Sequence, residues 1–505
     1  MTETSERVVV AGGGPTGLLL AGELALAGVQ AVVLDRREGI EEFSAGMAIH
    51  SRSLDLLRLR GLADRIAPGD IFTWPRTPFG FLWLDLTEVD EREYTHAYPQ
   101  WRAERLLEEW VTELGVEVRR GSEVTGFTQD DAGVSVHVRA ADGPYRISGR
   151  YLVGCDGPDS AVRRVAGIPF PGSGKSYYGV LADVELTGGD HDLFESGLHE
   201  NGVFGALPLR PGTTRLMTIE FDTEPDPDAG PVTPEELLAS VGRVRGREVE
   251  IAATHFSYRY GGRTRLAERY REGNVFLAGE AAHQLFVSGT QGLNTSLHDA
   301  FNLGWKLAAT LHGWAPPGLL DTYQAERHPV GELVARHSRA QMSLMHPLAE
   351  MTPLRDMLSE LIRYGSVNQY LMEATAAFGY PSAGAVLARD PVKGEPHPLT
   401  GYPVRDVALT TKAGATSVGA LLRGGRGVLL DLTGGAEAGP WPDGWADRVD
   451  MVTAEPAPEI GAPAVLLRPD GHIAWAGGGE SDGKGIESAL RTWFGEPGAP
   501  ATGRE

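Results

Sequence analysis

The spacing of apolar residues changes several times along the chain, and each change marks a predicted element. Short apolar runs at residues 8–10 and 32–34 enclose a stretch with helical spacing, which predicts strand, helix and strand within residues 1–40. Helical spacing also predicts helices over residues 47–66, 102–115, 293–312 and 318–345. Alternation with a period of two predicts strands within residues 116–153 and 176–260, and an apolar run predicts one at 274–279.

Two stretches interrupt this order. Residues 74–83 are rich in Trp, Pro and Phe, which suits strands or loops over an apolar pocket. Four prolines between residues 390 and 403 predict a linker. Apolar runs near residues 427–432 and 464–476 then predict strands in a separate segment, 404–495.

Length and charge restrict the class of protein. A chain of 505 residues is too long for one hydrophobic core and predicts two or three domains. Its content of 42% hydrophobic and 23% charged residues is typical of a globular protein. The net charge of −22 opposes binding to nucleic acids and to anionic membranes, because both carry negative charge.

Cysteine content and the N-terminal residues restrict the class further. Cys155 is the only cysteine, so the chain forms no internal disulfide, which excludes the flavin disulfide reductases. Glu3 and Glu6 lead directly into a predicted strand, unlike a signal peptide, and no apolar stretch is long enough to span a bilayer. We therefore expect a cytoplasmic protein.

A glycine-rich turn follows the first predicted strand. Gly12, Gly14 and Gly17 form G-x-G-x-x-G, and Asp35 ends the second strand. In such a βαβ unit the glycines allow a tight turn and close approach of a pyrophosphate, the helix N-terminus attracts phosphate, and the acid accepts hydrogen bonds from a ribose. The alternative is a glycine-rich loop in an ordinary α/β domain. The complete order favours a nucleotide cofactor, NAD or FAD rather than NADP, because an acid disfavours a 2′-phosphate.

A second segment has a similar form. Asp156 and Gly157 follow an apolar run at residues 151–153 and precede Arg163 and Arg164. Asp156 could position a ribose or fix the turn, and one of the arginines could meet a phosphate. Taken alone, this pattern more often marks a plain strand-to-helix turn.

A third segment combines Gly279 and Glu280, at the end of a predicted strand, with a glycine-rich loop that opens a long helix at Gly292. Backbone N–H groups at this helix N-terminus would stabilise the negative charge of a reduced flavin by roughly 0.3–2 kcal/mol. His283 is expected to be structural rather than catalytic. Trp305 and Lys306 are expected only to pack and solvate the helix.

The three segments, in this order, resemble the flavin-dependent aromatic hydroxylases of the para-hydroxybenzoate hydroxylase type (group A monooxygenases). In particular they resemble the three-domain members that oxidise polycyclic aromatic polyketides in antibiotic pathways. Gln100 matches a family glutamine near the flavin, and residues 50–53 match the first crossover helix. Residues 468–475 look like the thioredoxin-like C-terminal domain of the family, without a cysteine pair.

The resemblance implies an α/β (α+β overall) fold with a Rossmann-like FAD-binding domain, a β-sheet substrate domain and a thioredoxin-like C-terminal domain. It assigns residues 1–75, 100–175 and 265–345 to the FAD-binding domain, 76–99 and 176–264 to the substrate domain, 346–389 to a helical connection, 390–403 to a linker and 404–505 to the thioredoxin-like domain. It also implies bound, non-covalent FAD, with NADPH or NADH as a transient reductant.

The implied reaction transfers one oxygen atom from O₂, through a flavin C4a-hydroperoxide, to a polycyclic aromatic substrate. No metal, nucleic acid or membrane takes part, a homo-oligomer is left open, and no residue is assigned as catalytic. The turns and the resemblance together predict these cofactor contacts: Gly12, Gly14, Pro15, Thr16, Gly17, Asp35, Arg36, Gln100, Asp156, Gly279, Glu280, Gly292, Leu293 and Asn294.

The chain departs from the family pattern at three places. Glu280 replaces the usual aspartate, Phe286 and Val287 replace a proline pair beside the flavin, and residues 44–46 replace an arginine. Two alternatives to hydroxylation therefore stay open. One is Baeyer–Villiger oxidation of a similar substrate, and the other is a non-oxygenating flavoprotein that binds or shapes a pathway intermediate.

Overall fold

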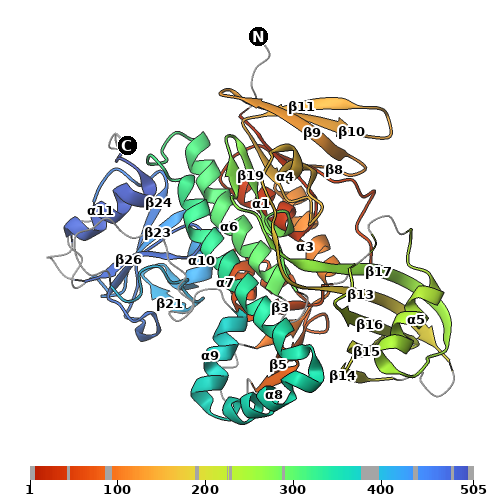
Figure 1. The fold of residues 1–505 in the computed structure, drawn as a ribbon. Helices are drawn as coiled ribbons and strands as arrows, with labels where there is room; N and C mark the ends of the chain where they lie inside the picture. The colour runs from red at the N-terminus through yellow and green to blue at the C-terminus, as the bar shows by residue number, and fades with distance from the viewer. Residues whose placement is uncertain are drawn as a thin grey trace.

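The computed structural model describes residues 6–42, 46–74, 76–85, 94–187, 193–224, 226, 230–286, 291–376, 397–435, 442–478 and 483–498. Two long helices, α6 (Gln291–Leu311) and α7 (Asp321–Met345), run through the middle of the molecule. Figure 1 shows the C-terminal segment in blue on one side of them and a yellow-green antiparallel sheet on the other. No helix in these ranges is long and apolar enough to cross a bilayer.

A six-stranded sheet forms the centre of the N-terminal part. Its order is β18-β19-β12-β1-β2-β8, in which β19, β12, β1, β2 and β8 are parallel. The strands are β1 (Val8–Ala11), β2 (Ala31–Leu34), β8 (Glu117–Arg119), β12 (Tyr151–Gly154), β18 (Arg271–Glu272) and β19 (Val275–Leu277). Because β1, β2, β12 and β19 are buried, they read as continuous apolar runs. This sheet confirms the predicted βαβ unit.

Three predicted helices are confirmed, and one is wrong in part. Helices α3 (Gln100–Glu113), α6 and α7 lie where helical spacing predicts them. The predicted helix over residues 47–66 instead begins as strand β3 (Ala48–His50), continues as α2 (Ser51–Arg58) and ends in the short 3₁₀ helix η1 (Ala63–Arg65). Residues 48–50 are extended because they pair with β7 (Thr95–Ala97), a partner distant in sequence.

The Trp- and Pro-rich stretch forms small sheets of its own. Strand β4 (Phe72–Trp74) pairs with β7, and β5 (Arg76–Phe79) pairs with β6 (Leu82–Asp85). Leu84 and Phe79 pack against helices α8 (Leu348–Ile362) and α9 (Gly365–Ala376). The described residues of 76–99 therefore contribute no strand to the antiparallel sheet that Figure 1 shows in yellow-green.

Two antiparallel sheets confirm the strands predicted within residues 116–153 and 176–260. One has the order β11-β10-β9, from β9 (Glu123–Asp130), β10 (Gly133–Arg139) and β11 (Tyr145–Gly149). The other has the order β14-β15-β16-β13-β17-β20, from β13 (Gly172–Leu186), β14 (Glu195–His199), β15 (Gly202–Arg210), β16 (Thr213–Phe221), β17 (Ile251–Leu266) and β20 (His283–Gln284). Because β20 lies within the third segment, between Gly279 and Gly292, one edge of this sheet lies beside the candidate site.

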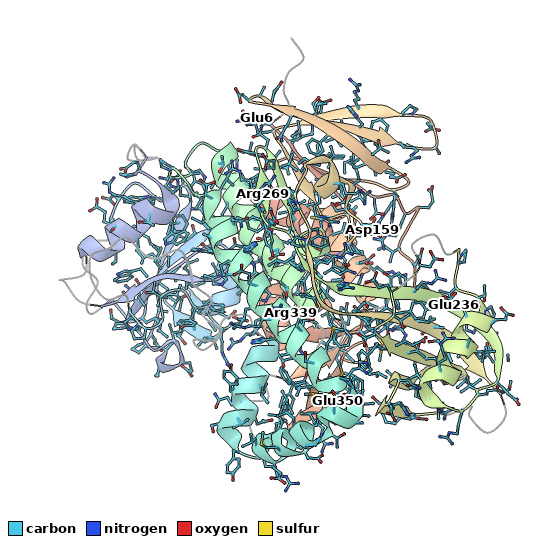
Figure 2. The ribbon with its side chains drawn as sticks, in the orientation of Figure 1. Glu6, Asp159, Glu236, Arg269, Arg339 and Glu350 are labelled. Atoms are coloured by element: carbon cyan, nitrogen blue, oxygen red, sulfur yellow. The ribbon has the colours of Figure 1, made fainter. Side chains whose placement is uncertain are left out.

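Helix α5 (Pro234–Arg245) interrupts the stretch predicted as strands and is a correction to it. Thr233 caps the helix by accepting a hydrogen bond from the Glu236 backbone, Pro234 begins it, and Gly246 ends it with a left-handed φ of 71°. These are the usual helix boundary signals, so the sequence itself carries the information for α5. The helix covers one face of the antiparallel sheet, and Figure 2 labels Glu236 in its first turn.

The C-terminal segment has a mixed sheet with the order β24-β23-β25-β26. Its elements are β21 (Ala408–Thr411), β22 (Gly414–Ser417), α10 (Val418–Leu422), β23 (Gly427–Asp431), β24 (Val449–Thr453), η5 (Pro458–Ile460), β25 (Ala464–Leu467), β26 (Ile473–Gly477) and α11 (Gly483–Phe494). The predicted strands near 427–432 and 464–476 are confirmed. The thioredoxin-like assignment and the domain boundaries stay predictions, and residues 390–396 of the linker lie outside the described residues.

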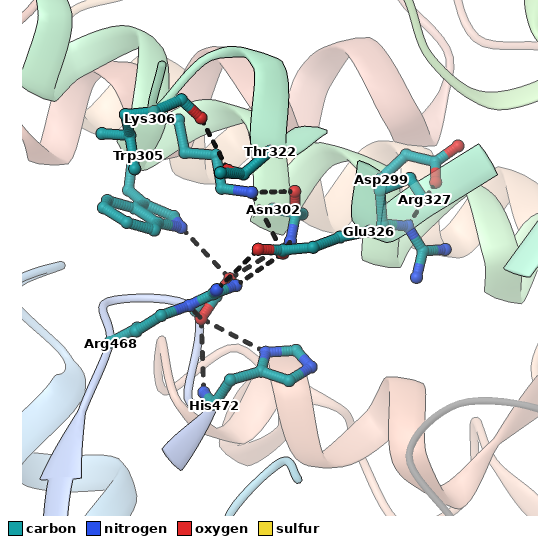
Figure 3. A network of polar contacts seen from close by, with 11 residues as sticks. Asp299, Asn302, Trp305, Lys306, Thr322, Glu326, Arg327, Arg468 and His472 are labelled. Atoms are coloured by element: carbon teal, nitrogen blue, oxygen red, sulfur yellow. Dashed lines mark hydrogen bonds and ion pairs between the residues drawn. The ribbon is translucent and has the colours of Figure 1, made fainter. Parts of the chain in front are cut away.

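Buried charges join the C-terminal segment to α6 and α7. The Arg468 guanidinium donates two hydrogen bonds to Glu326 of α7, at 2.9 and 3.0 Å, and also pairs with Asp470 (Figure 3). Lys306 of α6 lies 3.0 Å from Glu326, and the Trp305 indole donates to Asp470 at 3.1 Å. The expectation that Trp305 and Lys306 merely pack and solvate a helix is therefore wrong, because both are buried in this network.

Acid is expected to weaken this network. Burial opposes ionisation of Glu326, but Arg468 and Lys306 outweigh it and lower its pKa from 4.5 to about 2. Between these two values the unfolded chain binds more protons than the folded one, so stability falls as the pH falls from 4.5 to about 2. In denaturant titrations, Glu326 should contribute up to about 1.4 kcal/mol per pH unit to the fall in the free energy of unfolding over this range. The Glu326→Gln variant should lack this contribution. The exposed Glu350→Gln serves as control and should leave the slope unchanged.

Candidate functional site

The glycine-rich turn between β1 and α1 (Pro15–Leu26) is closed on the side of the sheet and open at the helix N-terminus. Gly12 has a φ of 107°, and a Cβ there would overlap the carbonyl oxygen of Cys155. A Cβ on Gly17 would overlap the Gly12 carbonyl oxygen. In contrast, a Cβ on Gly14, the N-cap of α1, would have no atom within 4 Å. The α1 N-terminus therefore faces open space.

Asp35, at the end of β2, is buried and already has hydrogen-bond donors around it. The Gly13 N–H donates to Oδ2 at 2.6 Å, the Arg37 N–H donates to Oδ1 at 2.7 Å, and the Arg37 guanidinium donates to both oxygens at 3.2 Å. Burial opposes ionisation, but these donors outweigh it and lower the pKa of Asp35. A ribose hydroxyl would have to replace a bond from Arg37, while Arg36 beside it is exposed.

Asp156 follows β12 and binds the first turn of helix α4 (Ala161–Val165), whose N-cap is Ser160. Its Oδ2 accepts hydrogen bonds from the N–H groups of Ala161, at 2.7 Å, and Val162, at 3.1 Å. Its Oδ1 is buried and accepts no hydrogen bond from the described residues. Arg163 donates to the carbonyl oxygens of Ala281 and Pro158, so its guanidinium fixes the turn. This segment therefore offers one unused carboxylate oxygen.

The third segment meets the first at Gly279, which has a φ of 67°. A Cβ there would lie only 2.8 Å from the hydroxyl oxygen of Thr16 in α1. Glu280 follows, and its Oε1 lies 3.9 Å from the position that a Cβ on Gly292 would take, at the start of α6. The N-termini of α1 and α6 and the Glu280 carboxyl group thus belong to one region, in which the neighbouring Leu293 is partly buried.

Two residues that are predicted to contact the cofactor instead bind other parts of the protein through their side chains. Asn294 accepts a hydrogen bond from the His50 N–H at 2.8 Å and donates to the Ala48 carbonyl oxygen at 3.3 Å, which holds β3 on α6. The Gln100 side chain donates to Glu104 at 2.8 Å. Any contact from Asn294 to a cofactor would therefore come from its backbone.

His283 belongs to a buried network that holds the third segment in place. Its Nε2 lies 2.8 Å from Asp299 of α6, which also accepts hydrogen bonds from the Gly279 N–H and from Arg327 of α7. This geometry agrees with the expectation of a structural histidine. Sequence reasoning missed Asp299 and Arg327 as positioning residues, because their spacing on two separate helices gives no local signal.

The antiparallel sheet supplies aromatic side chains to the same region. Tyr258 of β17 is 44% exposed, and burial together with Glu280 raises its pKa to about 12. Tyr177 of β13 is buried, and burial together with Glu280 raises its pKa as well. Arg259 and Arg263 instead form ion pairs at the sheet surface, with acidic side chains of neighbouring segments. Of these polar β17 side chains, only Tyr258 therefore interacts with Glu280.

Phe286 lies at a position where the family pattern has proline. It is 1% exposed, its N–H donates to the Ser338 hydroxyl at 2.8 Å, and its ring packs edge-on against Tyr177 with centroids 4.8 Å apart. Met342 and Met345 of α7 belong to the same apolar cluster. This cluster presents apolar surface to the sheet face that bears Tyr177. Val287, Ser44 and Ala45 lie outside the described residues.

Comparisons with known proteins identify the family of the chain. The family model "FAD binding domain" matches residues 5–338, and "Aromatic-ring hydroxylase, C-terminal" matches residues 397–497. A dialkyldecalin synthase from Streptomyces rugosporus is 42% identical, over 97% of this chain and 99% of that protein. The solved anhydrotetracycline hydroxylase OxyS from Streptomyces rimosus is 39% identical over 97% of this chain and 99% of its own, with a TM-score of 0.86.

A solved relative also shows the cofactor. Aklavinone-11 hydroxylase, solved as a ternary complex with FAD and aklavinone, is 27% identical over 98% of this chain and all of its own, with a TM-score of 0.71. The family models cover both the N-terminal part and the C-terminal segment. The chain therefore belongs to the FAD-binding aromatic-ring hydroxylases, a family of flavin-dependent monooxygenases with members in polyketide antibiotic biosynthesis.

Proposed function

We propose that the protein is an FAD-dependent, NAD(P)H-consuming monooxygenase that inserts one oxygen atom from O₂ into a polycyclic aromatic polyketide. The observation that carries the proposal is the meeting of two helix N-termini, α1 and α6, with the aromatic face of the antiparallel sheet. The relatives that act on tetracycline and aklavinone skeletons support the substrate class.

The residues around the site fit FAD. The open position at Gly14 leaves room for a pyrophosphate at the α1 N-terminus, and the unused Oδ1 of Asp156 can accept a hydrogen bond from a hydroxyl group. The N–H groups at the start of α6 suit the electron-rich edge of a flavin. Bound FAD would supply electron transfer from NAD(P)H and the activation of O₂, which side chains alone cannot perform.

The chain itself would bind and shield the substrate. Tyr258 is 44% exposed and offers a ring surface on which a flat aromatic molecule can stack, while Tyr177 is buried against Tyr260 and Phe286. Phe286 and the methionines of α7 exclude water behind them. The pKa of Tyr258, raised to about 12, keeps its hydroxyl group protonated near neutral pH, so this group can donate a hydrogen bond to an oxygen substituent of the substrate.

Isotope labelling tests this function. Under ¹⁸O₂, a polycyclic phenol or quinone should stimulate NAD(P)H oxidation and gain one labelled atom. Label in a new phenol would indicate hydroxylation, and label in a new ester would indicate Baeyer–Villiger oxidation. Protein without FAD serves as control. Continued NAD(P)H and O₂ consumption without modification of any polycyclic substrate would contradict the proposal.

A non-oxygenating role is the second candidate. Its support is the 42% identity to a dialkyldecalin synthase, together with Phe286 and Glu280 at positions where the hydroxylase pattern has other residues. In this role the same apolar face would fold a flexible substrate for ring closure. Product formation without O₂ and NAD(P)H would favour this role over oxygenation.

A further inference from the structure

A turn of the C-terminal segment is buried against helices of the N-terminal part. It runs from Arg468 to Gly471, between β25 and β26, and the Gly471 N–H closes it with a hydrogen bond of 2.9 Å to the Arg468 carbonyl oxygen. The charged side chains of Arg468 and Asp470 are both 0% exposed. Turns between strands usually lie at the surface, so this burial indicates a role beyond the connection of two strands.

Two of the buried contacts reach α6 and α7. Arg468 forms its two hydrogen bonds with Glu326 of α7, and Asp470 accepts a hydrogen bond of 3.1 Å from the indole of Trp305 of α6 (Figure 3). The side chains of one turn therefore hold these two helices side by side.

The backbone of the same turn reaches α1 through one bridging side chain. The Pro469 carbonyl oxygen accepts a hydrogen bond of 2.8 Å from Arg60, and the Arg60 guanidinium forms two hydrogen bonds of 2.6 Å with Glu23 of α1. Glu23 lies at a close contact between α1 and α6, since a Cβ on Gly304 of α6 would be only 2.6 Å from the Glu23 Cβ. The turn therefore binds α1, α6 and α7 close to the place where α1 and α6 meet.

Both α1 and α6 run from this contact to the proposed FAD site. At about 1.5 Å per residue, Pro15 lies roughly 12 Å from Glu23 along α1, and Gln291 lies roughly 20 Å from Gly304 along α6. A tilt of about 5° at the contact would then move these N-termini by roughly 1–2 Å. Such a shift exceeds the spread of about 0.5 Å in the lengths of normal N–H···O hydrogen bonds.

We propose that the turn at residues 468–471 is a positioning element for FAD, which acts through the helices that it binds. Its insertion sets the relative placement of the α1 and α6 N-termini, so packing of the C-terminal segment and binding of FAD strengthen each other. The inference rests on the proposed FAD site. Because coupling between two equilibria is reciprocal, FAD should hold the turn in place by the factor by which the turn strengthens FAD binding.

Two alanine variants of the C-terminal segment test the proposal. Gly471 and Gly461 have φ angles of 77° and 78°, so alanine strains the backbone to a similar degree at both. At Gly471 the new Cβ would lie 2.6 Å from Cδ1 of Leu59, in the N-terminal part, whereas the nearest atom at Gly461 lies at 3.6 Å, an ordinary contact. Titration of FAD-free protein with FAD, followed by flavin fluorescence, should show a Kd at least about fivefold higher for Gly471→Ala and within about twofold of wild type for Gly461→Ala.

A double variant separates helix placement from a general loss of stability. Valine has no Cδ1 atom, so Leu59→Val combined with Gly471→Ala should restore the Kd to within about twofold of Leu59→Val alone. Circular dichroism of the FAD-free proteins checks that each variant is folded. A folded Gly471→Ala protein with the wild-type Kd, or a double variant without restored affinity, would overturn the proposal.

Hydrogen exchange of the wild-type protein measures the reciprocal effect without any variant. Saturating FAD should slow exchange of the Arg468 and Gly471 amides, which donate hydrogen bonds of 2.9 Å at the turn, at least about fivefold more than exchange of the buried Val136 amide in β10. Equal slowing at both places would indicate only general stabilisation and would contradict the proposal. If wild type binds no FAD, the proposed FAD site itself is wrong, so the two failures are distinguishable.

Discussion

A Gly14→Val variant is expected to purify as a folded, colourless protein. A side chain at residue 14 meets no protein atom within 4 Å, and the φ of −80° and ψ of −176° suit valine, so the FAD-free fold should lose at most about 1 kcal/mol from the poorer N-cap. The same side chain would occupy the space in which the proposed site holds the pyrophosphate. Affinity for FAD should fall at least about a hundredfold, or ~2.7 kcal/mol.

Two matched valine variants make this experiment specific. Gly17→Val places its side chain against the Gly12 carbonyl oxygen, so it should destabilise the fold itself by about 1–3 kcal/mol or more. Gly69→Val also meets open space, but far from the α1 N-terminus in sequence, and should stay yellow. Absorbance near 450 nm and thermal unfolding of FAD-free protein separate the three cases. A yellow Gly14→Val protein with wild-type affinity would show that the cofactor is placed wrongly.

Arg468→Met is expected to give the largest loss of stability. The guanidinium is fully buried, forms two hydrogen bonds with Glu326, pairs with Asp470 and lies 4.4 Å from the ring centroid of Trp493. Its removal leaves two buried carboxylates without their main positive partner. A loss of about 3–5 kcal/mol is expected, since breaking one side of a buried ion pair is far more costly than its net contribution suggests.

The exposed pair of Arg65 and Glu113 provides the control. Arg65 also donates two hydrogen bonds to one carboxylate, at 3.0 and 2.8 Å, but its side chain is 40% exposed. Arg65→Met should therefore cost about 1 kcal/mol or less. Urea titrations followed by Trp fluorescence measure the stability, since two of the ten tryptophans, Trp305 and Trp493, lie at this interface. If the two variants were equally stable, the buried network would not hold the C-terminal segment in place.

A second set of buried contacts, around Arg60, holds the C-terminal segment against the rest of the protein. These contacts explain why the sequence does not predict how that segment packs. Arg60 follows α2, forms two bonds of 2.6 Å with Glu23 of α1, and donates to the carbonyl oxygens of Leu422 and Pro469. These four positions are far apart in the sequence and none has a distinctive spacing. A buried arginine cannot be told from an exposed one by its neighbours along the chain, because its burial depends on which distant segment covers it.

Local pattern by itself determined the parallel strands, the three long helices and the position of the glycine-rich turns. Such elements depend on apolar periodicity and on backbone space over a few residues, both of which the amino acids specify directly. The boundary signals of α5 belong to this class too, since Thr233, Pro234 and Gly246 act locally.

Only the tertiary structure decided which polar groups remain available. It placed Arg37 on Glu104, Asn294 on β3 and Lys306 in a buried network. It also turned residues 48–50 into a strand. The physical reason is common to all of these cases: hydrogen-bond partners and burial come from segments tens to hundreds of residues away, and their free energies outweigh local preference.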